Sequence, residues 1–283
     1  MNHAARRRRL AAETAPLAAR IREIQHELSE FLDERQQLEP VTSKGGADSV
    51  FIARSLSRRV VRAVVRVVNP HRAVAPAPGD QPWRVPLPGP ARIDAEWDAY
   101  QRLSGDGLSP APLWRTHDAS ACRHVSGVRV SRRLVRRRAQ VWRYLDETLA
   151  LAAAAHRRGV THQDLNLGNI IDSRVGPGLF APARPGGALH LIDFEYGPAS
   201  GQSIAARRQL DVLTLLDEFA RPRRGGRRLA RDPERFTRAV CREVGSGVRE
   251  AASGLQIGHL RHLRRCRPLR EAAERVFPHL GAD

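Results

Sequence analysis

Two segments decide the fold: Gly159-Val-Thr-His-Gln-Asp-Leu-Asn-Leu-Gly-Asn-Ile-Ile171 and Leu189-His-Leu-Ile-Asp-Phe-Glu195. The first segment follows residues 139–158, whose apolar residues recur at helical spacing and which end at a glycine, a common helix stop. Apolar residues of the kind found in strands lie beside the polar ones in both segments. The pattern predicts a long helix followed by two loops that carry carboxylate and amide side chains next to short strands.

The polar residues of these loops have a recognisable spacing. His162-x-Asp164-x-x-x-x-Asn169 resembles the catalytic loop of protein-kinase-like phosphotransferases, and the Ile-Asp-Phe run at residues 192–194 resembles their metal-binding Asp-Phe-Gly segment. The resemblance implies an α+β, bilobal protein-kinase-like fold with a small β-rich N-lobe and a larger helical C-lobe. An N-terminal helical extension would precede the two lobes.

The resemblance also implies a role for each residue of the two loops. Asp164 would orient the acceptor hydroxyl and accept its proton, while Asn169 and Asp193 would hold Mg²⁺ that bridges the phosphates of ATP. His162 belongs to the same catalytic loop, and we expect it to buttress the metal-binding segment rather than to carry a proton. Phosphoryl transfer needs charge neutralisation and an oriented hydroxyl more than covalent help, so two carboxylates and one amide suffice.

The sequence upstream departs from the family pattern. Arg66, in Ala-Val-Val-Arg, stands where the family has its phosphate-binding lysine, and Glu96 is the helix glutamate expected to pair with it. Arginine can grip phosphate but differs in size and shape from lysine. Lys44, beside Gly45 and Gly46, offers a second way to reach the nucleotide. The sequence leaves open which of these two basic residues meets the phosphates.

Among kinase-like families, the Asp-Leu-Asn run that begins at Asp164 looks most like the bacterial lipopolysaccharide kinases that phosphorylate Kdo or heptose of the inner core. This resemblance implies an ATP- and Mg²⁺-dependent kinase acting on a sugar hydroxyl of that core or of a related anionic glycolipid. Glu195 replaces the glycine of the metal-binding segment, and together with Arg66 it motivates an alternative, a non-catalytic pseudokinase or scaffold. A protein or small-molecule acceptor is a further alternative.

The organisation along the chain predicts a helical extension at 1–40, an N-lobe at 41–125 and a C-lobe at 126–283. Apolar residues at three-and-four spacing predict one helix over residues 16–38, closed by Pro40. This helix either packs on the main body or mediates a homodimer as a coiled coil. Residues 49–54 and 59–68 predict two antiparallel strands, and the proline-rich residues 69–90 predict an exposed loop.

Composition narrows the class of partner. The formal net charge of +18 creates a positive field that favours phosphates or an anionic membrane surface, and Lys44 is the only lysine. No aromatic residues alternate with the basic runs, so a specific nucleic-acid partner is not expected. Without an apolar run of about 18 residues, we expect a cytoplasmic protein, with peripheral contact at the inner membrane as an option. The three cysteines show no CxxC spacing and are expected to be buried, reduced thiols.

Overall fold

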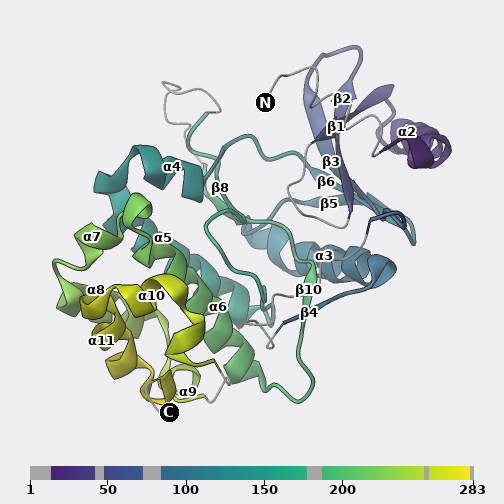
Figure 1. The fold of residues 1–283 in the computed structure, drawn as a ribbon. Coiled ribbons are helices and arrows are strands. Elements are labelled where there is room, and N and C mark those ends of the chain that lie inside the picture. Colours follow the sequence, from purple (N-terminus) through teal and green to yellow (C-terminus); the bar gives the residue numbers. More distant parts are fainter. Residues whose placement is uncertain (1–13, 42–47, 73–83, 177–186, 252–254, 281–283) are drawn as a thin grey trace. The chain divides into compact units, whose positions relative to one another are not determined.

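The computed structural model describes residues 14–41, 48–72, 84–176, 187–251 and 255–280 (Figure 1). The chain forms two compact units. Unit 1 contains the described residues within 1–76, 86–104 and 110–124, and unit 2 contains those within 77–85, 105–109 and 125–283. Unit 1 is built around one sheet, whereas unit 2 is larger and mainly helical. The predicted α+β class, with a small β-rich part and a larger helical part, is therefore confirmed.

Unit 1 is organised by a five-stranded antiparallel sheet. Its order is β1 (Gln36–Val41), β2 (Ser49–Ser55), β3 (Val61–Val67), β6 (Ala119–Arg123) and β5 (Pro112–Arg115). Alternate residues of β2 are buried, and the second half of β3 repeats this pattern, as expected for strands with one face on a core. The two strands predicted from β-branched runs are thus confirmed as β2 and β3.

One face of the sheet is covered by helix α2 (Ala18–Phe31), which follows a short 3₁₀ turn at Ala15–Leu17. Ile24 and Leu28 of α2 are fully buried and share a core with Phe51 of β2 and Val65 of β3. The apolar stripe of this helix is therefore used within the unit. This arrangement matches the prediction that the helix packs on the body, and it leaves less apolar surface for a dimer contact.

The prediction that this helix continues to Leu38 is wrong. The helix ends at Phe31, Asp33 takes a left-handed conformation with φ of 48°, and residues 36–41 form strand β1. Leu38 fits the three-and-four spacing by coincidence, because it is also buried in the period-two pattern of a strand. Pro40 is tolerated there because β1 pairs on one side only, with β2.

The other face of β3 carries Arg66, which alternates with the buried Val65 and Val67. Helix α3 (Gly89–Leu103) lies on this side, since its Glu96 receives hydrogen bonds from Arg66. Helix α3 continues into a 3₁₀ turn at Ser104–Asp106. The proline-rich segment was predicted as a loop up to residue 90, but the helix already begins at Gly89, with Pro90 in its first turn, where proline costs no hydrogen bond.

Unit 2 is built on two long helices, α5 (Val141–Arg157) and α6 (Ile204–Ala220). The left-handed Gly159 (φ 73°) stops the first helix, as predicted, and the Ser203 hydroxyl caps the start of the second. Shorter elements surround this pair: α4 (Val130–Arg136), η3 (Arg138–Gln140), η4 (Pro222–Arg224), α7 (Gly226–Leu229), α8 (Pro233–Glu243), α9 (Ser246–Arg249), η5 (Ile257–His259), α10 (Arg261–Arg265), α11 (Arg267–Val276) and η6 (Pro278–Leu280).

Short strands carry the loops of interest. Strand β8 (Ile170–Asp172) lies between β7 (Val128–Arg129) and β9 (Leu189–Leu191), and both pairings are antiparallel. A second small sheet joins β4 (Arg84–Pro86) to β10 (Tyr196–Pro198). Strand β4 falls in the segment that was predicted to be irregular.

Two further observations concern the predictions from composition. No helix in the described ranges is long and apolar enough to cross a bilayer. The three cysteines are free thiols, as expected. Their predicted burial is wrong, because Cys241 is exposed and Cys122 and Cys266 are only half-buried.

Candidate active site

The loop after α5 is held by one buried carboxylate of α6. Both oxygens of Asp211 accept backbone hydrogen bonds, at 2.8 Å from the nitrogen of His162 and at 2.7 Å from that of Gln163. The His156 ring also lies 3.0 Å from this carboxylate. Because a buried carboxylate is stable only when its oxygens are satisfied, Asp211 fixes the backbone immediately before Asp164.

His162 connects this loop to the second one. Its Nε2 atom lies 2.9 Å from the carbonyl oxygen of Ile192, the residue before Asp193. Its ring packs on Phe194 with centroids 4.5 Å apart, and the side chain is buried. The ring therefore clamps the residues on both sides of Asp193, which favours the buttressing role expected for His162 over proton transfer.

Asp164 is surrounded by donors on both carboxylate oxygens. Arg84 of β4 forms an ion pair with Oδ1, and the amide nitrogens of Asn166 and Asn169 lie 3.1 and 3.2 Å from Oδ2. The side chain of Asp164 keeps 21% of its surface exposed. The Arg84 guanidinium also stacks over the Tyr196 ring at 4.4 Å, and burial raises the pKa of that tyrosine.

Two residues of the site have strained backbones. Gln163 and Asp193 have φ of 63° and 75°, in the left-handed region that side chains other than glycine rarely adopt. Asp33 and Arg59 are the other two such residues in the described ranges, and both lie in connections beside strands of unit 1. Strain of this kind persists where the surroundings enforce it, and it is concentrated at functional sites. Asp211 and His162 supply that enforcement here.

Asn169 and Asp193 have the chemistry of a magnesium site. The amide nitrogen of Asn169 donates hydrogen bonds to the backbone oxygen and the carboxylate of Asp164. Its amide oxygen is therefore the atom that can coordinate a cation. The backbone oxygen of Asn169 accepts a hydrogen bond from Ile192 at 3.0 Å, which joins its loop to the residue before Asp193. One carboxylate and one amide oxygen, completed by water and phosphate oxygens, are ligands that Mg²⁺ prefers. The residues present therefore fit this ion.

Unit 1 contains a separate cluster of buried ion pairs. Arg66 donates to Glu96 at 3.0 and 3.3 Å, so the pair anticipated from the sequence is present. Arg66 also donates to Asp48 at 3.3 Å, and Arg92 holds the same carboxylate at 2.6 and 3.0 Å. Tyr100 donates to Glu96 as well, at 2.9 Å. This cluster fixes the guanidinium of Arg66 against α3, and the predicted residues Lys44, Gly45 and Gly46 lie outside the described residues.

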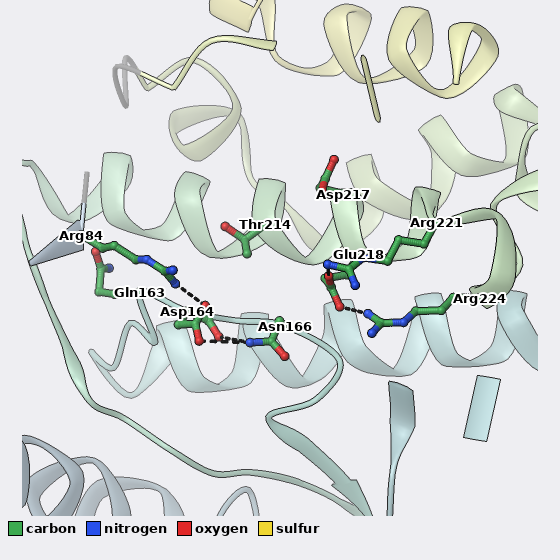
Figure 2. A pocket seen from close by; sticks show the side chains of 9 residues that line it. All are labelled: Arg84, Gln163, Asp164, Asn166, Thr214, Asp217, Glu218, Arg221 and Arg224. Carbon is green, nitrogen blue, oxygen red and sulfur yellow. Dashed lines mark hydrogen bonds and ion pairs between the residues drawn. The ribbon is translucent and has the colours of Figure 1, made fainter. Parts of the chain in front are cut away.

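A pocket of about 370 Å³ opens beside Asp164 within unit 2 (Figure 2). Its nine lining residues are all polar or charged: Arg84, Gln163, Asp164, Asn166, Thr214, Asp217, Glu218, Arg221 and Arg224. In Figure 2 the first four lie together at the Asp164 loop. The others lie along α6 and in the turn that follows it. Glu218 forms ion pairs with Arg221 and Arg224 at that far end. The candidate base thus sits in the wall of a charged cavity.

Sequence reasoning missed several residues that build this site. Arg84 stands in a proline-rich segment that was taken for a loop. Asp211, Thr214 and Glu218 belong to α6, a helix from which no site residue was predicted. Their spacing of three and four places them on one side of α6, and a polar stripe on an otherwise apolar helix is the signal that identifies them.

No family model matches the chain, and no curated protein matches its sequence. Among solved structures, one described as "WaaP in complex with acyl carrier protein" is similar to this chain with a TM-score of 0.49 and 15% identity, over 90% of this chain and 92% of that one. A Rio2 kinase–ADP/Mg²⁺–phosphoaspartate complex from Chaetomium thermophilum gives a TM-score of 0.41 and 14% identity, over 71% and 60% of the two chains.

Proposed function

We propose that this protein is an ATP-dependent phosphotransferase of the lipopolysaccharide kinase type, which phosphorylates a sugar hydroxyl of the inner core or of a related glycolipid. The observation that carries the proposal is the joint positioning of Asp164, Asn169 and Asp193. Asp211 holds the loop of the first two, and His162 links that loop to Asp193. A loop fixed by buried hydrogen bonds gives the pre-organisation that phosphoryl transfer requires.

Each residue of the site has a separate role in the proposed reaction. Asp193 and the amide oxygen of Asn169 would hold Mg²⁺, which supplies charge neutralisation on the phosphates when bound. Asp164 orients the acceptor hydroxyl and takes its proton. As the hydroxyl oxygen bonds to the γ-phosphorus of ATP, the bond from that phosphorus to the oxygen of ADP breaks. In unit 1, we propose that the positive charge of Arg66 attracts the phosphates of ATP and that Glu96 positions its guanidinium.

The net charge supports an anionic acceptor. A formal charge of +18 attracts a phosphorylated glycolipid or the anionic leaflet that carries it. The protein would then work at the cytoplasmic face of the membrane as a peripheral enzyme.

The test is a transfer assay with purified protein, γ-labelled ATP, Mg²⁺ and a bacterial lipopolysaccharide and lipid extract. Asp193→Asn removes one ligand charge at nearly constant shape, and we expect it to lower labelling of the glycolipid at least a hundredfold. Asp106→Asn is the matched control, because Asp106 forms a surface ion pair with Arg158. It should label like the wild type. Equal labelling by Asp193→Asn and the wild type would contradict the proposal.

A second candidate function is a non-catalytic kinase-like protein. The observation that favours it is the position of Arg66, whose guanidinium is bound to two buried carboxylates, Asp48 and Glu96. The same assay separates the two functions. A folded wild-type protein that binds ATP but labels no lipid, sugar or protein acceptor would support the non-catalytic function.

A further inference from the structure

We propose that the pocket between the Asp164 loop and helix α6 is the acceptor site, and that it binds a hydroxyl-rich sugar through Gln163, Thr214 and the Glu218–Arg221–Arg224 cluster. The inference rests on the proposed function, because Asp164 is placed there as the group that takes the proton of the acceptor hydroxyl. It adds the location of the acceptor and the residues that select it.

The side-chain amide of Gln163 is unsatisfied. This side chain is 4% exposed and lines the pocket, yet neither its Oε1 nor its Nε2 atom has a hydrogen-bond partner. Buried polar groups without partners are unfavourable, so a ligand that pairs with both of them would be stabilised. The strained backbone of Gln163 and the bonds to Asp211 hold the residue in this place. A donor and an acceptor side by side match a sugar, whose hydroxyls both donate and accept.

The lining of the pocket is polar or charged at every residue. None of the nine residues is apolar or aromatic, so the pocket offers no surface for an acyl chain and no ring on which a base or an aromatic side chain would stack. Its three arginines are matched by three carboxylates. A balanced, fully polar lining favours a ligand recognised by hydrogen bonds over one recognised by net charge.

The pocket lies directly beside the proposed base. Asp164 and Asn166 stand in the wall of the pocket, so a hydroxyl bound there lies beside the carboxylate that would take its proton. A volume of about 370 Å³ is small for a ligand site and suits one or two sugar rings. Figure 2 shows Thr214 midway along α6, with the Glu218 cluster farther from Asp164. The reacting ring would lie near Gln163, and the next ring near Glu218.

The test uses the core oligosaccharide of a bacterial lipopolysaccharide, with its acyl chains removed, and a serine-containing peptide of similar size for comparison. Calorimetry without ATP measures binding, and steady-state kinetics with ATP and Mg²⁺ gives KM for each acceptor. Gln163→Leu removes the amide oxygen and nitrogen at similar side-chain volume, and Thr214→Val removes one hydroxyl. The matched controls are Gln140→Leu and Thr237→Val, the same substitutions at half-buried residues of unit 2 that do not line the pocket.

We expect the wild type to bind the oligosaccharide more tightly than the peptide. Gln163→Leu should weaken oligosaccharide binding about tenfold and Thr214→Val about threefold, because each lost hydrogen bond contributes modestly. The rise in KM for the oligosaccharide should exceed any change in KM for ATP. Both controls should bind as the wild type does.

The outcomes separate this inference from the proposed function. Binding that weakens in both pocket variants, in a wild-type protein that transfers no phosphate, would support the sugar site and contradict the kinase. Phosphate transfer to the oligosaccharide with unchanged affinity in both variants would support the kinase and overturn the site. Tighter binding of the peptide would overturn the assignment to a sugar.

Discussion

The guanidinium of Arg84 is bound to Oδ1 of Asp164, so the residue proposed to accept a proton is already paired with a cation. Arg84 comes from strand β4, and its guanidinium also lies over the ring of Tyr196 in the paired strand β10. The side chains of Arg84 and Asp164 keep only 13% and 21% of their surfaces exposed. An ion pair at this depth is screened less than one at the surface. We expect this ion pair to restrain Asp164 until an acceptor enters the pocket that both residues line.

Arg84→Met tests this restraint. Methionine keeps most of the length of the side chain but removes the charge, so water would reach the freed carboxylate oxygen. We expect ATP hydrolysis in the absence of an acceptor to rise about threefold to tenfold, measured as ADP release. Arg238→Met, at an exposed residue of α8, is the control and should hydrolyse ATP like the wild type. A rate for Arg84→Met at or below that of the wild type would contradict a restraining role.

Asp211→Asn tests the anchor of the loop. The substitution keeps the shape of the side chain but replaces one acceptor oxygen with an NH₂ group. This donor then faces the backbone N–H of His162 or Gln163. We expect a loss of about 3 kcal/mol in the free energy of unfolding and loss of phosphoryl transfer. Urea unfolding measures the first effect and the transfer assay the second.

The control for the anchor is Asp232→Asn. Asp232 accepts a hydrogen bond from the backbone of Arg235 at the exposed start of α8, where asparagine caps almost as well as aspartate. This variant should unfold within about 0.5 kcal/mol of the wild type. A similarly small effect for Asp211→Asn would mean that the loop holds its conformation without the carboxylate.

Arg66→Lys tests the ion-pair cluster of unit 1. Lysine would restore the residue that the kinase-like families carry at this position, but its single ammonium cannot reproduce the fork that holds Glu96 and Asp48 together. We expect the free energy of unfolding to fall by about 2 kcal/mol. Arg62→Lys, at an exposed position of the same strand, should change it by less than about 0.5 kcal/mol. Thermal unfolding of both variants gives the comparison, and a stable Arg66→Lys would contradict the structural role.

The two loops could be predicted from the sequence because the residues that define them lie close together along the chain. The spacing from His162 to Asn169 fits on one loop, and the helix before it ends at a glycine, so both could be predicted without knowing what they touch. The pairing of Arg66 with Glu96 was also predictable, but only through resemblance to a family. Periodicity alone could not separate a helix from a strand at Leu38, because that residue satisfies both patterns.

The residues that the sequence did not reveal are those whose partners lie far along the chain. Asp211 contacts a loop 48 and 49 residues earlier, and Arg84 pairs with a carboxylate 80 residues later. Asp48 joins Arg66 to Arg92 across 18 and 44 residues. The polar stripe of α6 marks Asp211 as different from the apolar residues around it, but no local pattern shows which distant residues Asp211, Arg84 or Asp48 contacts, since tertiary contacts decide that. The candidate base was therefore predictable, whereas its anchor, its restraint and its pocket were not.

A final prediction concerns the attachment of helix α2 to unit 1 and its dependence on pH. Arg20 donates to both oxygens of Asp118 in the turn between β5 and β6, at 2.7 and 2.9 Å, and also to Thr116 at 3.0 Å. The hydrogen bonds from Arg20 hold the pKa of Asp118 below its ordinary value, against the opposing effect of burial. A carboxyl whose pKa is lowered on folding stabilises the protein above its unfolded pKa of about 3.9. That contribution is lost as the pH falls through the lower, folded value.

Arg20→Met should therefore reduce the free energy of unfolding by about 1 kcal/mol at pH 7, where the carboxylate is charged. The difference from the wild type should shrink as the pH is lowered below about 4, because protonation of Asp118 breaks the pair in the wild type as well. Urea unfolding at a series of pH values from 7 to 3 measures this convergence. Arg22→Met, at an exposed position on the same helix, should follow the wild type throughout. A gap between Arg20→Met and the wild type that stays constant down to pH 3 would show that Arg20 acts through packing rather than through its charge.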